Sequence, residues 1–269
     1  MMLYTWGGAR LFYEQRGTGP DIVLLHPTPV HHAFWLPAAA QLSTGYRVTV
    51  PDLRGHGRSE PGQGIINIER LCEDIEQLLD ATGIEAAFLA GCSIGSYTLY
   101  ELWRRIPERV RALAFCCGKP QPDTPANRAK RSEDIEKIRL DGTAEFFDRM
   151  TQTLVGATSR ARHPEKSQQL RAMMDTAGPE AIIAVQQGLA QRPDSVPTVS
   201  TITVPVLALA GVEDPGSTPG EMAVIHQRLP GSAWHVLPDA GHYAPYEQPE
   251  TVGRILRDFF DGVANQMVG

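Results

Sequence analysis

Cysteine is scarce in this sequence, and the few cysteines that are present follow no metal-binding or disulfide pattern. The 269 residues include four, Cys72, Cys92, Cys116 and Cys117, with no CxxC pair and no spacing typical of zinc. Neighbouring residues of a strand point to opposite faces, so a disulfide between Cys116 and Cys117 is not expected. We predict reduced, buried thiols, as in a cytoplasmic protein.

An excess of basic charge and a long hydrophobic run are also lacking. The formal net charge is −6, whereas nucleic acids and anionic membranes both attract basic patches, so neither is expected as the main partner. Residues 1–17 lack the basic and apolar regions of a secretory signal, and no apolar run could span a bilayer. We expect a cytoplasmic protein; a homo-oligomer is compatible with the sequence, which does not specify the oligomeric state.

What is present is a regular alternation of short apolar runs with helical patterns. Hydrophobic residues make up 42% of the chain, enough for a sizeable core. A hairpin is predicted around the dipeptide Gly7-Gly8. Further strands, apolar on both faces, are predicted at Ile22–His26, Tyr46–Val50, Ala86–Ala90, Ala112–Cys117, Val204–Ala210 and Ala233–Leu237. With helices at Asn67–Thr82 and Ser96–Ile106, the pattern predicts an α/β fold with a mostly parallel eight-stranded sheet.

The stretch from residue 120 to residue 201 interrupts this alternation. It contains no convincing strand, and its helical segments are expected at Arg128–Leu140, Thr143–Leu154, Pro164–Thr176 and Pro179–Gln191. Strands resume after it. We therefore expect an α/β core formed by residues 1–119 and 202–269, with residues 120–201 as a helical cap inserted over the sheet.

The strongest chemical motif is Gly91-Cys92-Ser93-Ile94-Gly95, a nucleophile elbow between a predicted strand and a predicted helix. Glycines are needed there because a side chain at Gly91 or Gly95 would collide with neighbouring backbone. The following helix points its N-terminus at the site, where free N–H groups favour a developing oxyanion. Ser93 is therefore the predicted nucleophile.

A serine nucleophile needs a base and an orienting carboxylate, which in this kind of fold follow it in the chain. His242 lies in the loop after the last predicted strand and is the predicted base. Asp214 ends the preceding strand and is the predicted acid, with the adjacent Glu213 as its rival. Asp239 is a better candidate for a turn former.

An oxyanion hole requires two backbone N–H groups. Ile94, which follows the nucleophile, is expected to supply one. The second is expected from the loop His26-Pro27-Thr28-Pro29, in which Thr28 is the one donor between two prolines that have no N–H.

Together with the segment Pro51–Ser59, these residues resemble the α/β-hydrolase superfamily over essentially the whole chain. Within it, the sequence is similar to the β-ketoadipate enol-lactonase-like and small carboxylesterase branch. The resemblance implies a four-helix cap between the sixth and seventh core strands, and no cofactor or metal. The chain departs from the family at Pro27, where relatives usually have glycine, and this change bears on the oxyanion loop.

A substrate pocket under the cap is expected from aromatic and methionine side chains, although such residues more often belong to the core. The candidates are His31, Phe34, Trp35, Tyr97, Met150, Met173 and Met174. The adjacent His31 and His32 make a poor metal pair, and no metal-binding motif is present, so no metal site is expected.

The sequence thus predicts hydrolysis of a small carboxylic ester or lactone through an acyl-enzyme. The same three residues would also serve a C–C bond hydrolase of ring-cleavage products or a cofactor-free perhydrolase. Epoxide hydrolysis and dehalogenation are disfavoured because those relatives have aspartate at the position of Ser93. A non-catalytic ligand-binding member of the fold is a further alternative.

Overall fold

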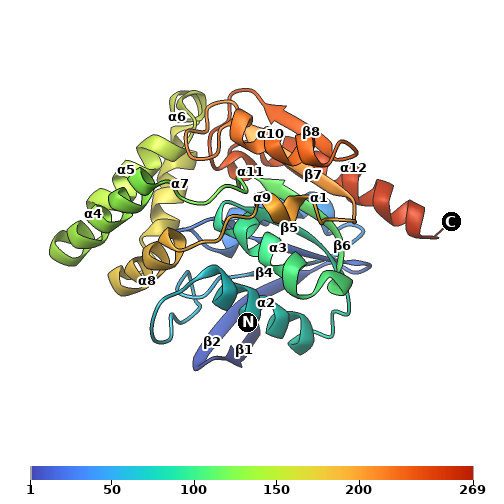
Figure 1. Cartoon of the computed structure of the whole chain (residues 1–269), viewed down its shortest axis with the longest axis horizontal. Coiled ribbons are helices and arrows are strands. Elements are labelled where there is room, and N and C mark those ends of the chain that lie inside the picture. Colours follow the sequence, from blue (N-terminus) through green and yellow to red (C-terminus); the bar gives the residue numbers. More distant parts are fainter. Residues whose placement is uncertain (1, 269) are drawn as a thin grey trace.

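The computed structural model describes residues 2–268, and within them one eight-stranded sheet forms the centre of the molecule (Figure 1). The strand order is β1-β2-β4-β3-β5-β6-β7-β8. Only β2 runs antiparallel to its neighbours, and all other pairs are parallel. The strands are β1 (Met2–Trp6), β2 (Ala9–Arg16), β3 (Asp21–Leu25), β4 (Arg47–Pro51), β5 (Ala87–Cys92), β6 (Val110–Cys116), β7 (Val206–Gly211) and β8 (Ala233–Leu237). This is the predicted α/β-hydrolase architecture.

The first two strands form the hairpin expected from Gly7-Gly8. Both glycines have positive φ, 54° and 72°, as the tight turn between the paired residues Trp6 and Ala9 requires. The hairpin places β2 against β4, so the parallel part of the sheet gains an antiparallel edge.

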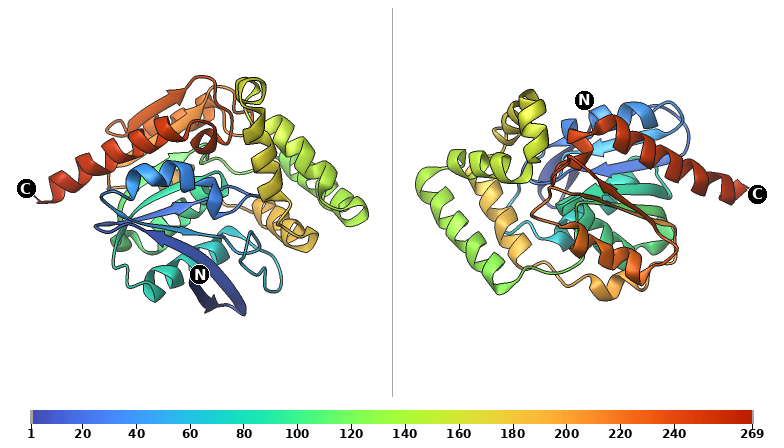
Figure 2. Two further views of the ribbon diagram at one scale, coloured as in Figure 1. Left: turned by 180° about the vertical axis from the view of Figure 1, so that it is seen from behind. Right: turned by 90° about the horizontal axis from the view of Figure 1, so that it is seen from above.

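Helices cover both faces of the sheet because the central strands are apolar on both sides. One face packs against α1 (Leu36–Leu42) and α12 (Pro249–Val268), and the other against α2 (Ile68–Ala81), α3 (Ile94–Arg105) and α10 (Pro219–Arg228). Figure 1 shows the second of these faces, and the view from behind in Figure 2 brings α1 and α12 to the front. Asn67 accepts a hydrogen bond from the Arg70 N–H and caps α2.

Between β6 and β7 the chain forms helices and no strand. These are α4 (Pro125–Asp141), α5 (Ala144–Leu154), α6 (Ala157–Arg162), α7 (Pro164–Met174), α8 (Pro179–Ala190) and α9 (Val196–Val199). Helices α4–α8, here called the cap, project to one side of the sheet (Figures 1 and 2). The short helices α6 and α9 were not expected, and α9 packs against the core helices α3 and α10.

The four cysteines are all buried and unpaired. Three further short helices complete the fold: η1 (His32–Phe34), η2 (Pro107–Arg109) and α11 (Ala244–Glu247), which precedes α12. No helix within residues 2–268 combines the length and the apolar character needed to cross a membrane.

Candidate active site

Ser93 occupies a strained turn between β5 and α3. Its φ of 53° and ψ of −115° lie in a region that non-glycine residues rarely adopt. The close packing of the turn explains its flanking glycines. A Cβ on Gly91 would lie 2.4 Å from the carbonyl carbon of Gly95, and a Cβ on Gly95 would lie 2.3 Å from the Leu25 carbonyl oxygen. The turn therefore holds Ser93 at the carboxyl end of β5, where it faces a cavity.

Ile94 is the first residue of α3. The first N–H groups of a helix have no partner within the helix, and they lie at its positive end. The Ile94 N–H is thus available next to Ser93, at the place expected for one donor of an oxyanion hole.

His242 and Asp214 are brought together by the loops that follow β8 and β7. The His242 Nδ1 lies 2.8 Å from Asp214 Oδ2 and 3.0 Å from Oδ1. The N–H groups of Gly216 and Ser217 donate to Asp214 Oδ1 at 2.7 and 3.0 Å and fix the carboxylate. Burial opposes ionisation of Asp214, but His242 and these N–H groups outweigh it, so the pKa of Asp214 lies below its usual value.

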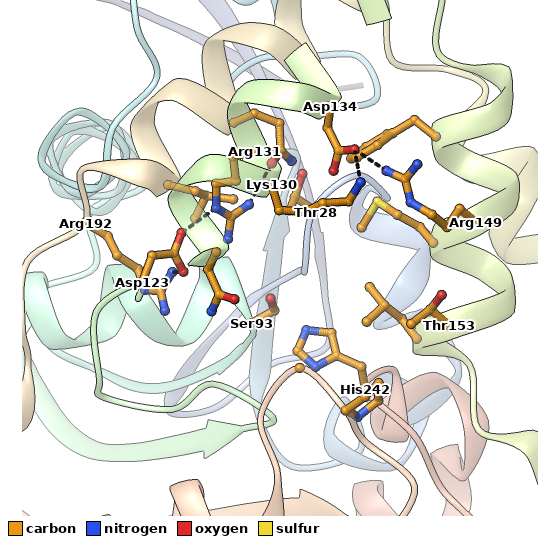
Figure 3. Close-up of a pocket in the computed structure, with 18 of the residues that line it drawn as sticks. Thr28, Ser93, Asp123, Lys130, Arg131, Asp134, Arg149, Thr153, Arg192 and His242 are labelled. Atoms are coloured by element: carbon orange, nitrogen blue, oxygen red, sulfur yellow. Dashed lines mark hydrogen bonds and ion pairs between the residues drawn. The ribbon is translucent and has the colours of Figure 1, made fainter. Parts of the chain in front are cut away.

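Ser93 and His242 line the same cavity, and Figure 3 shows the imidazole ring beside the serine. Because Nδ1 is occupied by Asp214, the Nε2 atom is the ring nitrogen left to act on a neighbouring hydroxyl. The three residues singled out from the sequence thus converge at one end of the sheet.

The two alternative carboxylates lie elsewhere. Glu213 accepts hydrogen bonds from the N–H and the hydroxyl of Thr158, at 2.9 and 2.5 Å, and caps the first turn of α6. Asp239 has a positive φ of 57° and pairs at the surface with Arg162. Neither side chain contacts His242, which leaves Asp214 as its carboxylate partner.

The loop that carries His242 is fixed by a buried glutamate and by the cap. Glu247 accepts hydrogen bonds from the N–H groups of Gly241 and Tyr243, on either side of His242, and from Gly156 in the cap. Burial raises the pKa of Glu247 although these N–H groups oppose the rise. The His242 N–H itself donates to the Leu154 carbonyl oxygen at 2.8 Å.

Thr28 lines the cavity, and two histidines hold its loop. Its hydroxyl lies 2.9 Å from His56 Nε2. His26 fixes the same loop, with Nδ1 2.9 Å from the Pro27 carbonyl oxygen and Nε2 accepting from the Leu53 N–H. Burial lowers the pKa of His26 to about 3, so the ring is neutral near pH 7. The Thr28 N–H has no hydrogen-bond acceptor within residues 2–268.

The side chains of His31, His32 and Asp52 place potential metal ligands within 4.8 Å of one another. Both Asp52 oxygens, however, accept hydrogen bonds: Oδ1 from the N–H and Nδ1 of His32, and Oδ2 from the Arg58 N–H. Asp52 therefore braces two loops, and this donor set fits a metal ion poorly. The absence of a metal site remains a prediction.

The cavity above Ser93 measures about 330 Å³ and lies between the sheet and the cap. Tyr97 and Met150 line it, as predicted. His31, Phe34 and Trp35 do not, and their prediction as residues of this pocket is wrong. Phe34 stacks on Tyr246, and Trp35 packs beside Phe34 in the core.

These three errors have a common cause. After Thr28 the chain continues into η1 and α1, and its apolar side chains pack in the core between the sheet and the helices α1 and α12. His31 stays half-buried beside His32. Met174 is likewise a core residue, and Met173 packs against that core rather than lining the cavity.

Sequence analysis missed the most distinctive feature of the cavity, which is its charged lining. Seven ionisable side chains of the cap and its flanking segment line it: Lys119, Asp123, Lys130, Arg131, Asp134, Arg149 and Arg192. Figure 3 labels all of them except Lys119. Polar residues on a helix ordinarily indicate a solvated face. No local pattern distinguishes a face turned to bulk water from one turned to an enclosed site.

The sheet order, the elbow at Ser93 and the His242–Asp214 pair define the class of α/β hydrolases. The chain belongs to that family: residues 20–249 match the model of the alpha/beta hydrolase fold. A curated relative, 3-oxoadipate enol-lactonase 1 of Acinetobacter baylyi, is 27% identical over 252 residues, covering 91% of this chain and 90% of the relative.

Two solved structures are similar over nearly their whole length. A thermophilic esterase from Thermogutta terrifontis with bound malate has 32% identity and a TM-score of 0.91, and the match covers 95% of this chain and 94% of the esterase. The enol-lactonase of Burkholderia xenovorans LB400 has 26% identity and a TM-score of 0.90, with coverage of 97% and 100%. The protein is thus a hydrolase with esterase and enol-lactonase relatives.

Proposed function

We propose that this protein hydrolyses a small carboxylic ester or lactone through an acyl-enzyme formed on Ser93. The observation that carries the proposal is the hydrogen bond between His242 and Asp214, formed at the cavity that Ser93 faces from its strained turn. This arrangement supplies a nucleophile, a base and an orienting carboxylate in the order that the fold requires. The esterase and enol-lactonase relatives support the same reaction class.

In the first step, the Ser93 hydroxyl attacks the carbonyl carbon and its proton passes to Nε2 of His242. Asp214 remains ionised, keeps the ring in the required tautomer and stabilises the imidazolium that forms. The low pKa of Asp214 suits this role, because the carboxylate is charged throughout the neutral range.

The carbonyl oxygen becomes an oxyanion in the tetrahedral intermediate. The N–H of Ile94 and the N–H of Thr28 would donate to it from opposite sides, which preserves the predicted oxyanion hole. His56 and His26 hold the Thr28 loop, so the donor does not depend on the glycine that relatives have in place of Pro27.

Collapse of this intermediate breaks the C–O bond, and the leaving oxygen takes the proton from His242. An ester releases its alcohol, whereas a lactone keeps the leaving oxygen tethered to the acyl group. Water then attacks the acyl-enzyme with His242 as base, which releases the acid and restores Ser93.

The proposal is tested by covalent labelling and turnover in the same preparation. A fluorophosphonate should label the wild-type protein stoichiometrically, and mass spectrometry should locate the adduct on Ser93. Ser93→Ala should abolish labelling and reduce turnover of an activated short-chain ester by about 10⁴-fold or more. Ser132→Ala, on the exposed surface of α4, is the control and should change neither. Full activity in Ser93→Ala would refute the mechanism.

A further inference from the structure

Two carboxylates line the cap side of the cavity, and two cations contact each of them. Asp134 forms an ion pair with Arg149 at 2.6 Å, and its Oδ1 lies 3.4 Å from the Lys130 Nζ. Asp123 is paired with Arg131 and Arg192. Lys130 also pairs with the exposed Glu133 at 3.4 Å, but Glu133 does not line the cavity. Among the residues that line the cavity, the cations therefore outnumber the carboxylates and leave a surplus of positive charge.

No other lining residue cancels this surplus. Lys119, the fifth cation, is neutralised by Glu221 at 2.6 Å. Among residues 2–268, Asp123 and Asp134 are the acidic side chains that line the cavity. The surplus is notable because the chain as a whole has a formal net charge of −6.

The cations around Asp123 and those around Asp134 differ in how many of their N–H donors already have a hydrogen-bond acceptor. In the group at Asp123, Arg131 also donates to Gln186 Oε1 at 2.6 Å. Arg192 donates to the Gln121 carbonyl oxygen and lies 4.5 Å above the Tyr97 ring. These two cations outweigh the cost of burying Asp123 and hold the pKa of its carboxyl below the usual range. This group serves mainly to tie α4 and α8 to the core.

The group at Asp134 retains free donors. Both Lys130 and Arg149 contact the same oxygen, Oδ1. The side chain of Lys130 is 51% exposed to solvent and that of Arg149 is 34% exposed. Both line the cavity. Figure 3 shows them converging on Asp134 at the cap end, with Ser93 and His242 at the opposite end.

We propose that Arg149 and Lys130 form a subsite for a carboxylate of the substrate, so that the enzyme selects esters or lactones whose acyl part carries a distal anionic group. The inference rests on the proposed hydrolytic function of Ser93. The planar guanidinium of Arg149 offers paired donors for a carboxylate, and Lys130 adds a second charge.

The test compares monomethyl glutarate, which is anionic, with methyl pentanoate, which has a methyl group where glutarate has its free carboxylate. Wild-type protein should show a higher kcat/KM for the anionic ester. Arg149→Gln should lower the ratio of the two kcat/KM values about tenfold or more, because a charged hydrogen bond is lost. Asp134 keeps Lys130 in this variant, so the cap retains a balanced pair.

Two further variants sharpen the comparison. Arg149→Lys restores a positive charge without the paired donors and should recover part of the preference. Arg139→Gln removes an equal charge from α4, where Arg139 pairs only with Glu136 at the surface, and should leave the ratio as in wild type. Calorimetric binding of glutarate provides a second measurement that needs no turnover, and Arg149→Gln should weaken it about tenfold.

The outcomes separate this inference from the proposed function. Equal kcat/KM for both esters in wild type, unchanged in Arg149→Gln, would overturn the carboxylate subsite and leave the hydrolase intact. Failure of Ser93 to react with a fluorophosphonate would instead overturn the hydrolase. Glutarate binding that is equal in wild type and Arg149→Gln would overturn the subsite whatever the catalytic result.

Discussion

Glu247 holds the peptide groups on both sides of His242. Its carboxylate accepts hydrogen bonds from the Gly241 N–H at 3.0 and 3.1 Å and from the Tyr243 N–H at 3.1 Å. The position of the imidazole therefore depends on a side chain that never reaches the cavity. Glu247 is a positioning residue, and its effect should appear in the chemical step.

Replacing Glu247 with glutamine places an amide NH₂ among N–H donors, so some of the hydrogen bonds that this side chain accepts from the backbone are lost. We expect Glu247→Gln to lower kcat roughly ten- to hundredfold with a smaller change in KM, because small misplacements of a base are costly. Steady-state kinetics would measure the effect. Glu250→Gln, exposed at the start of α12, is the matched control. A fall in the free energy of unfolding with unchanged kcat would indicate a purely structural role.

The adjacent acids Glu213 and Asp214 have different partners and should give opposite results. Asp214→Asn removes the charge that orients His242 and should reduce kcat by about 10⁴-fold. Glu213→Gln weakens the cap of α6 and should lower the free energy of unfolding by about 1 kcal/mol, with turnover close to wild type. Kinetics and urea denaturation of both variants would measure these effects. The reverse pattern would assign the catalytic acid to Glu213.

The buried side chain of His26 allows a prediction of how the free energy of unfolding changes with pH. Burial lowers the pKa of His26 to about 3 in the folded protein, from its usual value of 6.5. Between these values the unfolded chain takes up a proton that the folded protein does not. The free energy of unfolding should therefore fall as pH falls below 6.5, by up to about 1.4 kcal/mol per pH unit for this group. His56, whose pKa is also lowered mainly by burial, acts in the same direction.

Urea denaturation at pH 7, 6 and 5 would measure this slope in wild type and in His26→Gln. The variant should show a shallower slope, whatever its stability at pH 7. His163→Gln, at an exposed position on the cap, serves as the control and should keep the wild-type slope. An unchanged slope in His26→Gln would show that His26 takes up its proton equally in both states.

Glycine at the elbow should be indispensable for folding. A Cβ at Gly95 would lie 2.3 Å from the Leu25 carbonyl oxygen, so Gly95→Ala should destabilise the protein by about 3 kcal/mol or more. A Cβ at Gly220 meets nothing within 4 Å, and Gly220→Ala should stabilise α10 by up to about 1 kcal/mol. The urea midpoint, or the loss of soluble protein, measures both. Equal stability of the two variants would contradict the packing at the elbow.

The fold, and the approach of Ser93, Asp214 and His242 to one another, could be predicted because local rules determine them. Gly7-Gly8 specifies a turn, and Gly91 and Gly95 mark an elbow between a strand and a helix. In parallel α/β folds, the loops after successive strands meet at one edge of the sheet, so Asp214 and His242 could be assigned from chain order alone.

The residues that the sequence did not reveal depend on tertiary packing. Phe34 and Trp35 follow the oxyanion loop in the chain, yet the direction of that loop decides whether they enter the cavity or the core. Arg149 and Lys130 come from different helices, and the crossing of α4 and α5 brings them to one carboxylate. Glu247 forms its contacts through backbone N–H groups, which leave no trace in side-chain patterns.

The hydrogen bonds between the cap and the His242 loop limit how the cap can move. Leu154, Gly156 and Thr158 all bond to the loops that carry His242, Glu247 and Glu213. Lifting the cap at this end would displace His242, the proposed base. The junction of α5 and α6 is therefore a fixed anchor of the cap, and any movement of this junction would also move His242. The position of the cap and the alignment of His242 are thus mechanically coupled at this junction.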